Sequence, residues 1–185
     1  MAKLSEMTLE ELWQLFPIFL TEHKSYWYEW YIQEKDILND ILKNYNNYKI
    51  HHIGSTAISN IWAKPIIDIL IEFDIDTDLV MISNIFVKNG YICMSKSNNR
   101  ISLNKGYTEQ GFAEKVFHIH LRYQGDNNEI FFRDYLNKNQ DIAKEYETLK
   151  LSLWHKFEHN RDGYTQAKTD FIEKITKFAK DDFLQ

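Results

Sequence analysis

The sequence predicts an α+β fold, in which helices at both ends of the chain enclose a mixed β-sheet. Apolar residues recur at helical spacing near both termini, whereas short β-branched runs occupy the middle of the chain. We expect N-terminal helices over residues 1–46, a sheet core over 47–127 and a C-terminal helical segment over 128–185, packed together as one compact unit.

The N-terminal segment contains two predicted helices. Thr8 and Glu11 form a capping-box pattern, because the Thr8 hydroxyl can accept from a free backbone N–H and the Glu11 side chain can reach back. Apolar residues follow at helical spacing as far as Phe16. A longer apolar stripe then predicts a second helix over about residues 22–45.

The central segment contains a run that is typical of a strand buried on both faces. Residues 66–73 (IIDILIEF) are apolar and largely β-branched apart from Asp68 and Glu72. Four further strands and four helices are predicted after the N-terminal segment. The strands are expected at 49–53, 91–95, 100–104 and 116–123, and the helices at 76–89 (capped by Asp76 or Thr77), 129–138, 140–157 and 163–180.

The composition excludes several classes of protein. A formal net charge of −5 argues against a broad nucleic-acid-binding surface. The single cysteine, Cys93, excludes an internal disulfide and a cysteine-based zinc site. No apolar run approaches the roughly 20 residues that span a bilayer, and the N-terminus lacks the apolar stretch of a signal peptide. We therefore expect a cytoplasmic protein without a membrane contact, and leave its oligomeric state open.

Asp68 is the first candidate for chemistry. An ionised carboxylate in a buried strand costs several kcal/mol unless it is paired or bound to a metal ion. One interpretation is structural, with Asp68 satisfied by backbone N–H groups or by a nearby lysine such as Lys64. The other is that Asp68 holds Mg²⁺ or Mn²⁺. Because the chain has one cysteine, any metal site must use carboxylate, imidazole and water, which suits these ions better than structural zinc.

A turn of small residues precedes the Asp68 strand. Gly54, Ser55 and Thr56 follow the first predicted strand, and a turn of this kind that leads into a helix can bind phosphate oxygens. Most Gly-Ser pairs are plain turns. A phosphate cradle beside a metal carboxylate is, however, the minimum apparatus for phosphoryl or nucleotidyl transfer.

Several motifs together resemble one protein family. The stretch HIGSTAISNIWAKPIIDILI closely resembles the signature of the GrpB family of bacterial proteins, and FHIHLRY, FRDYL, EYETLKLSL and YTQAKTDFIEKI follow in the family's order. The resemblance covers roughly residues 27–177. This family is similar to the nucleotidyltransferase superfamily. The resemblance therefore implies a nucleotidyltransferase-like sheet, with a metal ion on Asp68 and the phosphates of a nucleoside triphosphate, or of another phospho-ligand, on Gly54 and Ser55.

The resemblance also bears on three histidines and a lysine. His118 and His120 alternate, so both project from one face of a strand. They are either a hydrogen-bonded pair on an exposed sheet face or pocket residues that bind a metal, contact a phosphate or act as acid and base. The resemblance favours the pocket and places their strand beside that of Asp68. His52, next to the turn, matches the family position, and Lys64 is expected to reach phosphates.

Two tyrosine–lysine pairs occur in the predicted C-terminal helices. Tyr146 and Lys150 are four residues apart, as are Tyr164 and Lys168, so each pair lies on one helix face. The lysines are either contacts for a triphosphate or ribose, or amphipathic side chains that lie over aromatic rings. A further local cationic region, of the size that a triphosphate would need, is indicated over residues 79–108, which contain four basic residues and no acidic one.

The resemblance leaves two main functions. The first is nucleotidyl transfer from a nucleoside triphosphate to an unknown acceptor. The second is a nucleotide- or phospho-ligand-binding module without turnover, which Leu70 favours because it stands where the superfamily has a second metal carboxylate. Glu72 points the same way as Asp68 but lies roughly 13 Å along the strand. A third hypothesis is a protein-interaction domain based on the aromatic N-terminal helices.

Overall fold

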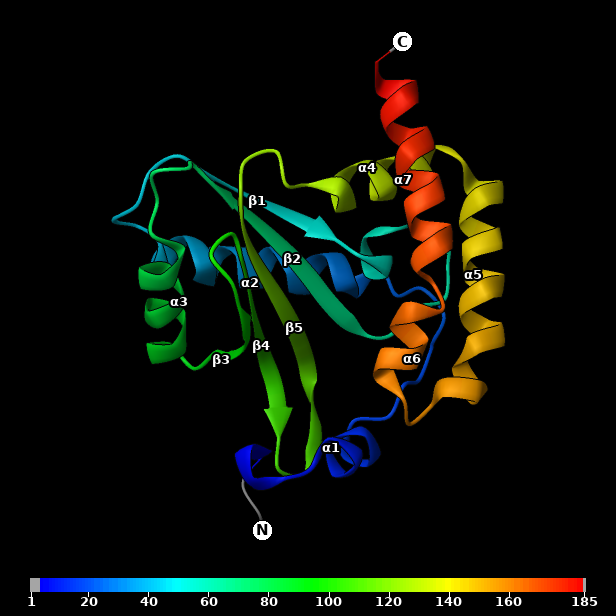
Figure 1. The fold of residues 1–185 in the computed structure, drawn as a ribbon, viewed down its shortest axis with the longest axis horizontal. Coiled ribbons are helices and arrows are strands. Elements are labelled where there is room, and N and C mark those ends of the chain that lie inside the picture. The colour runs from blue at the N-terminus through cyan, green and yellow to red at the C-terminus, as the bar shows by residue number, and fades with distance from the viewer. Residues whose placement is uncertain (1–3, 185) are drawn as a thin grey trace.

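The protein, described by a computed structural model over residues 4–184, is built around one mixed five-stranded sheet (Figure 1). The strand order is β1-β2-β5-β4-β3. β2 and β5 run parallel, and the other neighbouring pairs are antiparallel. This confirms the predicted α+β class. The strands are β1 (Tyr48–Ile53), β2 (Ile66–Phe73), β3 (Ile92–Lys96), β4 (Arg100–Thr108) and β5 (Gly111–Tyr123).

Seven α-helices accompany the sheet within the described residues. The predicted capping box is present, since the Thr8 hydroxyl accepts from the Glu11 N–H and the Glu11 carboxylate accepts from the Thr8 N–H. The helices are α1 (Leu9–Leu15), α2 (Tyr26–Ile41), α3 (Leu79–Lys88), α4 (Asn128–Lys138), α5 (Gln140–Trp154), α6 (Arg161–Gln166) and α7 (Thr169–Phe183).

Two helix predictions were wrong in detail. The cap of α3 is Asp78 rather than Asp76 or Thr77, because the Asp78 carboxylate accepts from the backbone N–H groups of Val80 and Met81. The single helix expected over 163–180 is two helices, α6 and α7. The chain turns between them through a short i→i+3 hydrogen bond from Lys168 to Thr165.

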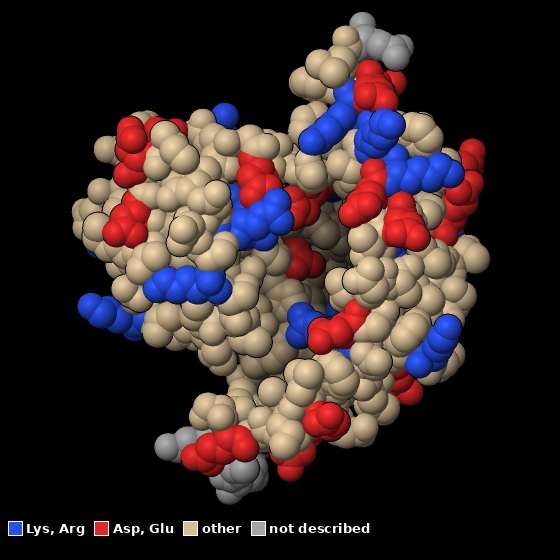
Figure 2. Space-filling view, in the orientation of Figure 1, with Lys and Arg blue, Asp and Glu red and all other residues tan. Residues whose placement is uncertain are grey.

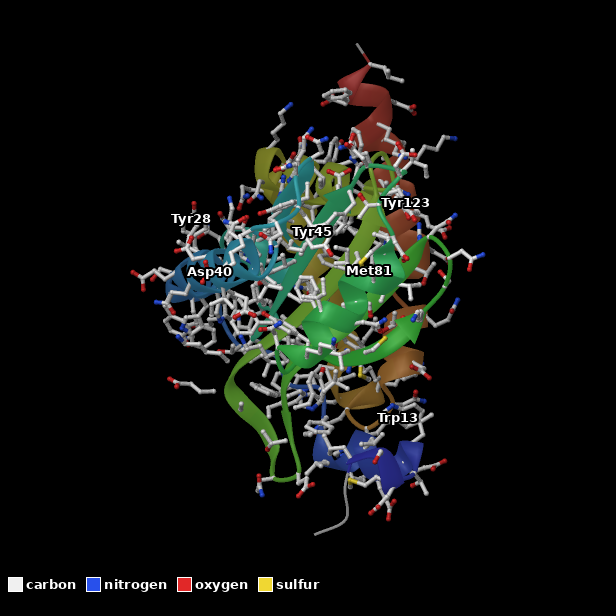
Figure 3. All side chains as sticks on the ribbon, turned by 90° about the vertical axis from the view of Figure 1, so that its left-hand side faces the viewer. Trp13, Tyr28, Asp40, Tyr45, Met81 and Tyr123 are labelled. Atoms are coloured by element: carbon white, nitrogen blue, oxygen red, sulfur yellow. The ribbon has the colours of Figure 1, made fainter. Side chains whose placement is uncertain are left out.

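Helices α2 and α3 cover one face of the sheet, as Figure 3 shows from that side. Trp27 and Leu38 of α2 are fully buried there, together with Phe86 of α3. At the helix contact the Tyr45 hydroxyl lies 3.6 Å from the Met81 sulfur. Trp27 of the aromatic helix α2 therefore belongs to the main core, whereas Tyr26 and Tyr28 of the same helix are exposed.

The C-terminal helices α4 to α7 lie beyond the opposite face of the sheet, and α4, α5 and α7 form a second, smaller core. It centres on Phe132, Leu136 and Tyr146, and residues that follow the Gly54 turn pack into it. Hydrogen bonds join the two parts: Glu147 accepts from the Trp62 N–H at 2.6 Å, and Arg133 donates to the His52 carbonyl. A cavity lies between the sheet and this helical core.

No helix among residues 4–184 has the length and apolar character needed to cross a bilayer. Lys and Arg side chains on the face shown in Figure 2 are interspersed with Asp and Glu side chains rather than gathered into a continuous basic surface. This arrangement on that face agrees with the expectation drawn from net charge.

Candidate functional site

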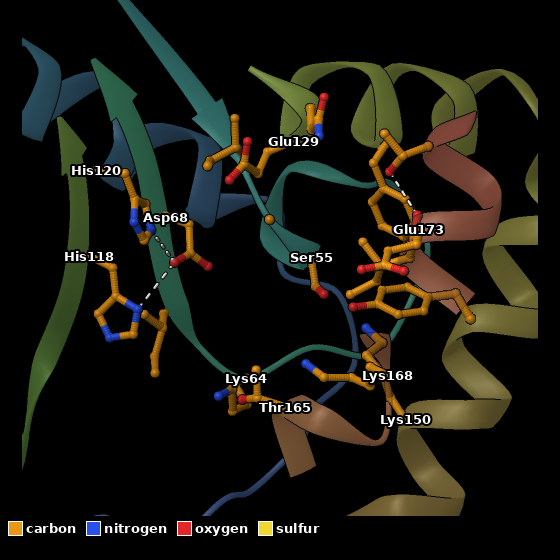
Figure 4. Close-up of a pocket in the computed structure, with 18 of the residues that line it drawn as sticks. Ser55, Lys64, Asp68, His118, His120, Glu129, Lys150, Thr165, Lys168 and Glu173 are labelled. Atoms are coloured by element: carbon orange, nitrogen blue, oxygen red, sulfur yellow. Dashed lines mark hydrogen bonds and ion pairs between the residues drawn. The ribbon is translucent and has the colours of Figure 1, made fainter. Parts of the chain in front are cut away.

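Asp68 and the two histidines converge on one point of the sheet. The parallel pairing of β2 and β5 sets Asp68 opposite His118, and Leu70 opposite His120. Both imidazoles reach the same carboxylate oxygen: His118 Nδ1 lies 3.1 Å, and His120 Nε2 3.3 Å, from Asp68 Oδ1 (Figure 4). The strand adjacency implied by the family resemblance is therefore confirmed, and the partners of Asp68 are imidazoles rather than Lys64.

The electrostatics of this cluster favour an ionised carboxylate. Burial opposes ionisation of Asp68, but hydrogen bonds and charge from His118 and His120 outweigh it and hold the carboxyl pKa well below its usual range. Burial lowers the pKa of His118, against the opposing effect of Asp68. The cluster therefore offers one carboxylate and two imidazoles, and the ligand atoms of the three side chains lie within 4.8 Å of one another.

Gly54 makes room for this carboxylate. Its φ of 72° and ψ of −174° fall in a backbone region that is essentially restricted to glycine. A Cβ at this position would lie 2.5 Å from Asp68 Oδ2. The turn leads only into a single 3₁₀ turn, Ser55–Ala57, so phosphate binding by a full helix N-terminus is not available here.

A cavity of about 700 Å³ opens in front of the cluster, between the sheet and helices α4 to α7 (Figures 2 and 4). Ser55 and Asp68 line it from the sheet side, and three lysines gather on the opposite wall. Most of the sequence-predicted residues are thus brought together. Those in its lining are Gly54, Ser55, Lys64, Asp68, His118, His120, Lys150, Tyr164 and Lys168.

Lys64, Lys150 and Lys168, three of the five lysines that line the cavity, have no matching carboxylate partners among the ion pairs of the described residues. Lys64 and Lys168 lie over the Tyr164 ring, at 5.5 and 4.3 Å from its centre. Lys150 lies 4.8 Å over Tyr146 and donates to the Trp62 carbonyl. The lysines therefore lie over aromatic rings, as one of the two interpretations predicted. These rings place three ammonium groups at one cavity.

Burial and mutual repulsion disfavour charge on these lysines. Burial, with the nearby charges of Arg161 and Lys168, lowers the pKa of Lys64 to about 7. Burial and the charges of Lys168 and Lys64 lower the pKa of Lys150 to about 7, and burial lowers that of Lys168 to about 8. An anion placed among them relieves the repulsion, so this wall of the cavity is suited to phosphate.

Sequence reasoning missed Arg161 and Tyr107. Arg161, in the first turn of α6, donates to the Tyr107 hydroxyl at 3.0 Å and to His118 Nε2 at 3.2 Å, and it lines the cavity. Tyr107 also lies 2.8 Å from His118 Nε2. The sequence signal for Arg161 was weak. A cation in the first turn of a helix is disfavoured by the helix dipole, so its position indicates a role other than stabilising the helix.

His52 and Thr56, which were expected to contact the ligand, lie outside the cavity lining. Residues alternate along β1, and His52 falls on the face covered by α2, where it stacks on Tyr31 with ring centres 4.8 Å apart. Its Nε2 pairs with the Thr56 hydroxyl, 3.0 Å away, and that hydroxyl bonds the Ile66 carbonyl. Burial lowers the pKa of His52 to about 4, which indicates a neutral core residue.

Of the carboxylates near Asp68, Glu129, Glu173 and Asp181 line the same cavity, whereas Glu72 does not. Leu70 is fully buried, and Glu72 is held at the far end of the strand by His51 at 2.9 Å and by Asn127 at 3.0 Å. The basic stretch 79–108 does not reach the cavity lining, so that prediction was wrong. Its residues belong to α3 and the β3–β4 edge, where Lys105 pairs with Glu34 and Arg100 with Asp126.

The sheet order, the glycine turn that faces Asp68 and the helices beyond the cavity give the chain a nucleotidyltransferase-like fold. The poly(U) polymerase Cid1, solved with MgGTP bound, superposes with a TM-score of 0.53 at 12% identity, over 74% of this chain and 44% of the polymerase. At that identity the likeness shows the fold alone.

The family is shown by closer relatives. A family model described as GrpB protein matches residues 17–177, and the chain belongs to this family. It is 35% identical to the glutamate-rich protein GrpB of Alkalihalophilus pseudofirmus over 85% of this chain and 93% of that protein. It is also similar to the crystal structure of GrpB from Enterococcus faecalis, with a TM-score of 0.77 and 32% identity over 90% of this chain and 100% of that one.

Proposed function

We propose that this protein binds a nucleoside triphosphate together with a divalent cation and transfers a nucleotidyl group to an acceptor hydroxyl. The observation that carries the proposal is the cavity itself, where a metal-ligand cluster at Asp68 faces lysines without carboxylate partners. A carboxylate for a cation and ammonium groups for phosphate oxygens are the two requirements of phosphoryl or nucleotidyl transfer.

The phosphates are assigned to the lysine wall. Lys64, Lys168 and Lys150 supply charge, and the Ser55 hydroxyl supplies a donor across the cavity. The Tyr164 hydroxyl is a further candidate contact. It is buried at the cavity and has no hydrogen-bond partner among the described residues, although buried phenols are usually satisfied. A ligand oxygen would satisfy it.

Asp68 offers a carboxylate to a divalent cation such as the proposed Mg²⁺ or Mn²⁺, and phosphate and water would supply further oxygen ligands. A bound cation would supply charge neutralisation at the phosphates. The chain's own groups orient the nucleotide and hold protons: His118 and His120 share the Asp68 oxygen and are the candidate acid and base for the acceptor hydroxyl. The nucleotide and Mg²⁺ named for Cid1 support this assignment by analogy of fold.

A binding module without turnover is the second candidate. Leu70 favours it, because the second carboxylate of a two-metal mechanism is replaced by a buried apolar side chain. The ligand contacts are the same in both proposals, so they differ only in whether pyrophosphate is released.

Thermal-shift measurements with each nucleoside triphosphate, with and without Mg²⁺ or Mn²⁺, test ligand binding. We expect stabilisation of the wild type, which follows mass action, and its loss in Asp68→Asn. Asp141→Asn, an exposed aspartate of α5, is the matched control and should respond like the wild type. Absence of stabilisation by every nucleotide would contradict both proposals.

Pyrophosphate release separates the two proposals. It is measured with RNA oligonucleotides, proteins and small hydroxyl compounds supplied in turn as acceptors. Release that requires His120 supports nucleotidyl transfer. Tight nucleotide binding with no release under any of these conditions supports the binding module.

A further inference from the structure

The donor set at Asp68 differs from the one that Mg²⁺ prefers. Mg²⁺ is a hard ion that takes oxygen ligands, usually one or two carboxylates with water and phosphate. Here two of the three converging side chains offer imidazole nitrogen. Imidazole suits the later first-row transition metals, whose affinity for nitrogen sites rises along the Irving–Williams series.

We propose that Asp68, His118 and His120 form a binding site for a divalent transition-metal ion of the Fe²⁺, Co²⁺ or Zn²⁺ class, which the protein binds before nucleotide and more tightly than Mg²⁺. The proposal refines the cation of the proposed function, makes His118 and His120 its ligands in place of the acid and base named there, and rests on that function for the ion's role. The binding itself requires no nucleotide.

The geometry of the cluster is close to that of a three-ligand site. Two atoms that each lie about 2.1 Å from one ion are at most about 4.2 Å apart. The ligand atoms here lie within 4.8 Å, so a small inward movement of the side chains brings them to one ion. They come from the adjacent strands β2 and β5, whose register fixes their spacing more firmly than a loop would. Such a site presents one carboxylate and two imidazoles on one side, and leaves the cavity side open.

The outer partners of the histidines also suit a metal site. Metal-bound histidines commonly donate their second ring N–H to an oxygen, which orients the ring. The Tyr107 hydroxyl lies 2.8 Å from His118 Nε2, and the Ser102 hydroxyl lies 3.4 Å from His120 Nδ1. Each histidine therefore has an oxygen beside the nitrogen that faces away from Asp68.

Arg161 opposes metal binding in a specific way. A guanidinium has only donors, so its contact at 3.2 Å makes His118 Nε2 an acceptor and places the ring proton on Nδ1, toward Asp68. Metal binding at Nδ1 requires the proton on Nε2 instead, where Tyr107 can accept it. Arg161 must then turn from His118, although its 3.0 Å bond to Tyr107 can remain. This residue is a positioning residue whose removal should strengthen metal binding.

Titration calorimetry with CoCl₂ and with MgCl₂, on tag-free protein without nucleotide, tests the inference. We expect a dissociation constant for Co²⁺ at least tenfold below that for Mg²⁺, and a visible Co²⁺ absorption band that ZnCl₂ abolishes. His120→Gln keeps a side chain able to bond Asp68 and should weaken Co²⁺ binding at least tenfold, as loss of a ligand does. His155→Ala, an exposed histidine outside the cavity lining, should bind like the wild type. Arg161→Gln should bind Co²⁺ more tightly, by about threefold or more.

Equal affinities for Co²⁺ and Mg²⁺, or wild-type Co²⁺ binding by a His120→Gln protein whose melting curve shows that it is folded, would overturn the inference. The outcome is distinguishable from that of the nucleotide proposal. Selective Co²⁺ binding with no response to nucleotides upholds the metal site and contradicts the proposed function. Nucleotide binding that needs Mg²⁺ and is unchanged in His120→Gln supports the proposed function and contradicts the transition-metal site.

Discussion

The buried charged side chains on the two faces of the sheet differ in whether they have partners of opposite charge. On the face under α2, Glu34 is 2% exposed and is fully matched: Lys105 donates to both of its oxygens, at 2.9 and 2.8 Å, and Tyr91 donates as well. On the cavity face, Lys64, Lys150 and Lys168 gather with no carboxylate partner among the described ion pairs.

The difference separates a structural cluster from a candidate binding site. A buried pair whose hydrogen bonds are all made stabilises one arrangement, and removing one partner leaves an uncompensated charge. Lysines gathered at an open cavity without carboxylate partners cost stability, and a protein can keep such a cluster where a ligand of opposite charge compensates it.

Lys105→Met should have the largest effect on stability. It leaves the buried Glu34 carboxylate with Tyr91 but without its cation, which should lower the free energy of unfolding by about 3 kcal/mol. Urea denaturation measures the change. Lys88→Met, at an exposed end of α3, is the control and should change it by less than about 0.5 kcal/mol. Equal effects of the two substitutions would mean that the Glu34 cluster is not structural.

Gly54→Ala should damage both stability and ligand binding. Its Cβ would lie 2.5 Å from Asp68 Oδ2 at a φ of 72°, so the variant should lose about 1–3 kcal/mol and displace the carboxylate from His118 and His120. Gly90→Ala is the matched control, because Gly90 also has a positive φ but nothing lies within 4 Å of its added Cβ. It should lose some stability and keep full cation affinity. Intact cation binding by Gly54→Ala would contradict the close fit around Asp68.

Phosphate affinity should fall as the pH rises. Burial lowers the pKa of Lys64 and Lys150 to about 7 and that of Lys168 to about 8, so these groups lose their protons between pH 7 and 9 while phosphate binding requires them charged. Calorimetry with inorganic triphosphate should show about tenfold weaker binding at pH 9 than at pH 7, or about 1.4 kcal/mol. Near pH 8, triphosphate binding should be accompanied by proton uptake by the protein. Repeating the calorimetry in buffers of different ionisation enthalpy measures this uptake. Affinity that is flat or rises over this range would argue against the lysine wall as the phosphate site.

Lys168→Met should have the smallest effect on stability and a clear effect on binding. Loss of its contact with the Tyr164 ring is offset by removal of a charge that burial and Arg161 disfavour, so the free energy of unfolding should change by no more than about 1 kcal/mol. Triphosphate affinity should fall about tenfold. A loss of stability as large as that of Lys105→Met would make the cavity lysines structural and remove the contrast between the two faces.

Much of the fold was readable from local pattern. The capping box at Thr8, the apolar run of β2 and the alternating histidines of β5 each follow from interactions within a few residues, and all three elements form where they were predicted. The errors arose where several neighbouring residues could each have capped or ended a helix. Asp78 caps α3 in preference to Asp76 or Thr77, and the last predicted helix breaks at Lys168.

The site was readable only in part. Family motifs pointed to Asp68, His118 and His120, but His52 was assigned to the wrong face, because adjacent histidines on a strand alternate and pattern does not say which side the helices will cover. The cationic stretch 79–108 was expected to suit a triphosphate, yet it lies outside the cavity lining, and its Arg100 and Lys105 pair with carboxylates elsewhere. Arg161 carried almost no local signal.

The sequence by itself determined the class of fold, the family motifs and the residue types available for chemistry, because these depend on local periodicity and on side-chain identity. The tertiary structure alone decided which charges would meet. Parallel pairing of β2 and β5 brings residues about 50 positions apart onto one carboxylate, and the packing of α5 to α7 carries Lys150, Arg161 and Lys168 to the opposite wall. Such contacts depend on chain topology and on the burial of two separate cores, which no short stretch of sequence encodes.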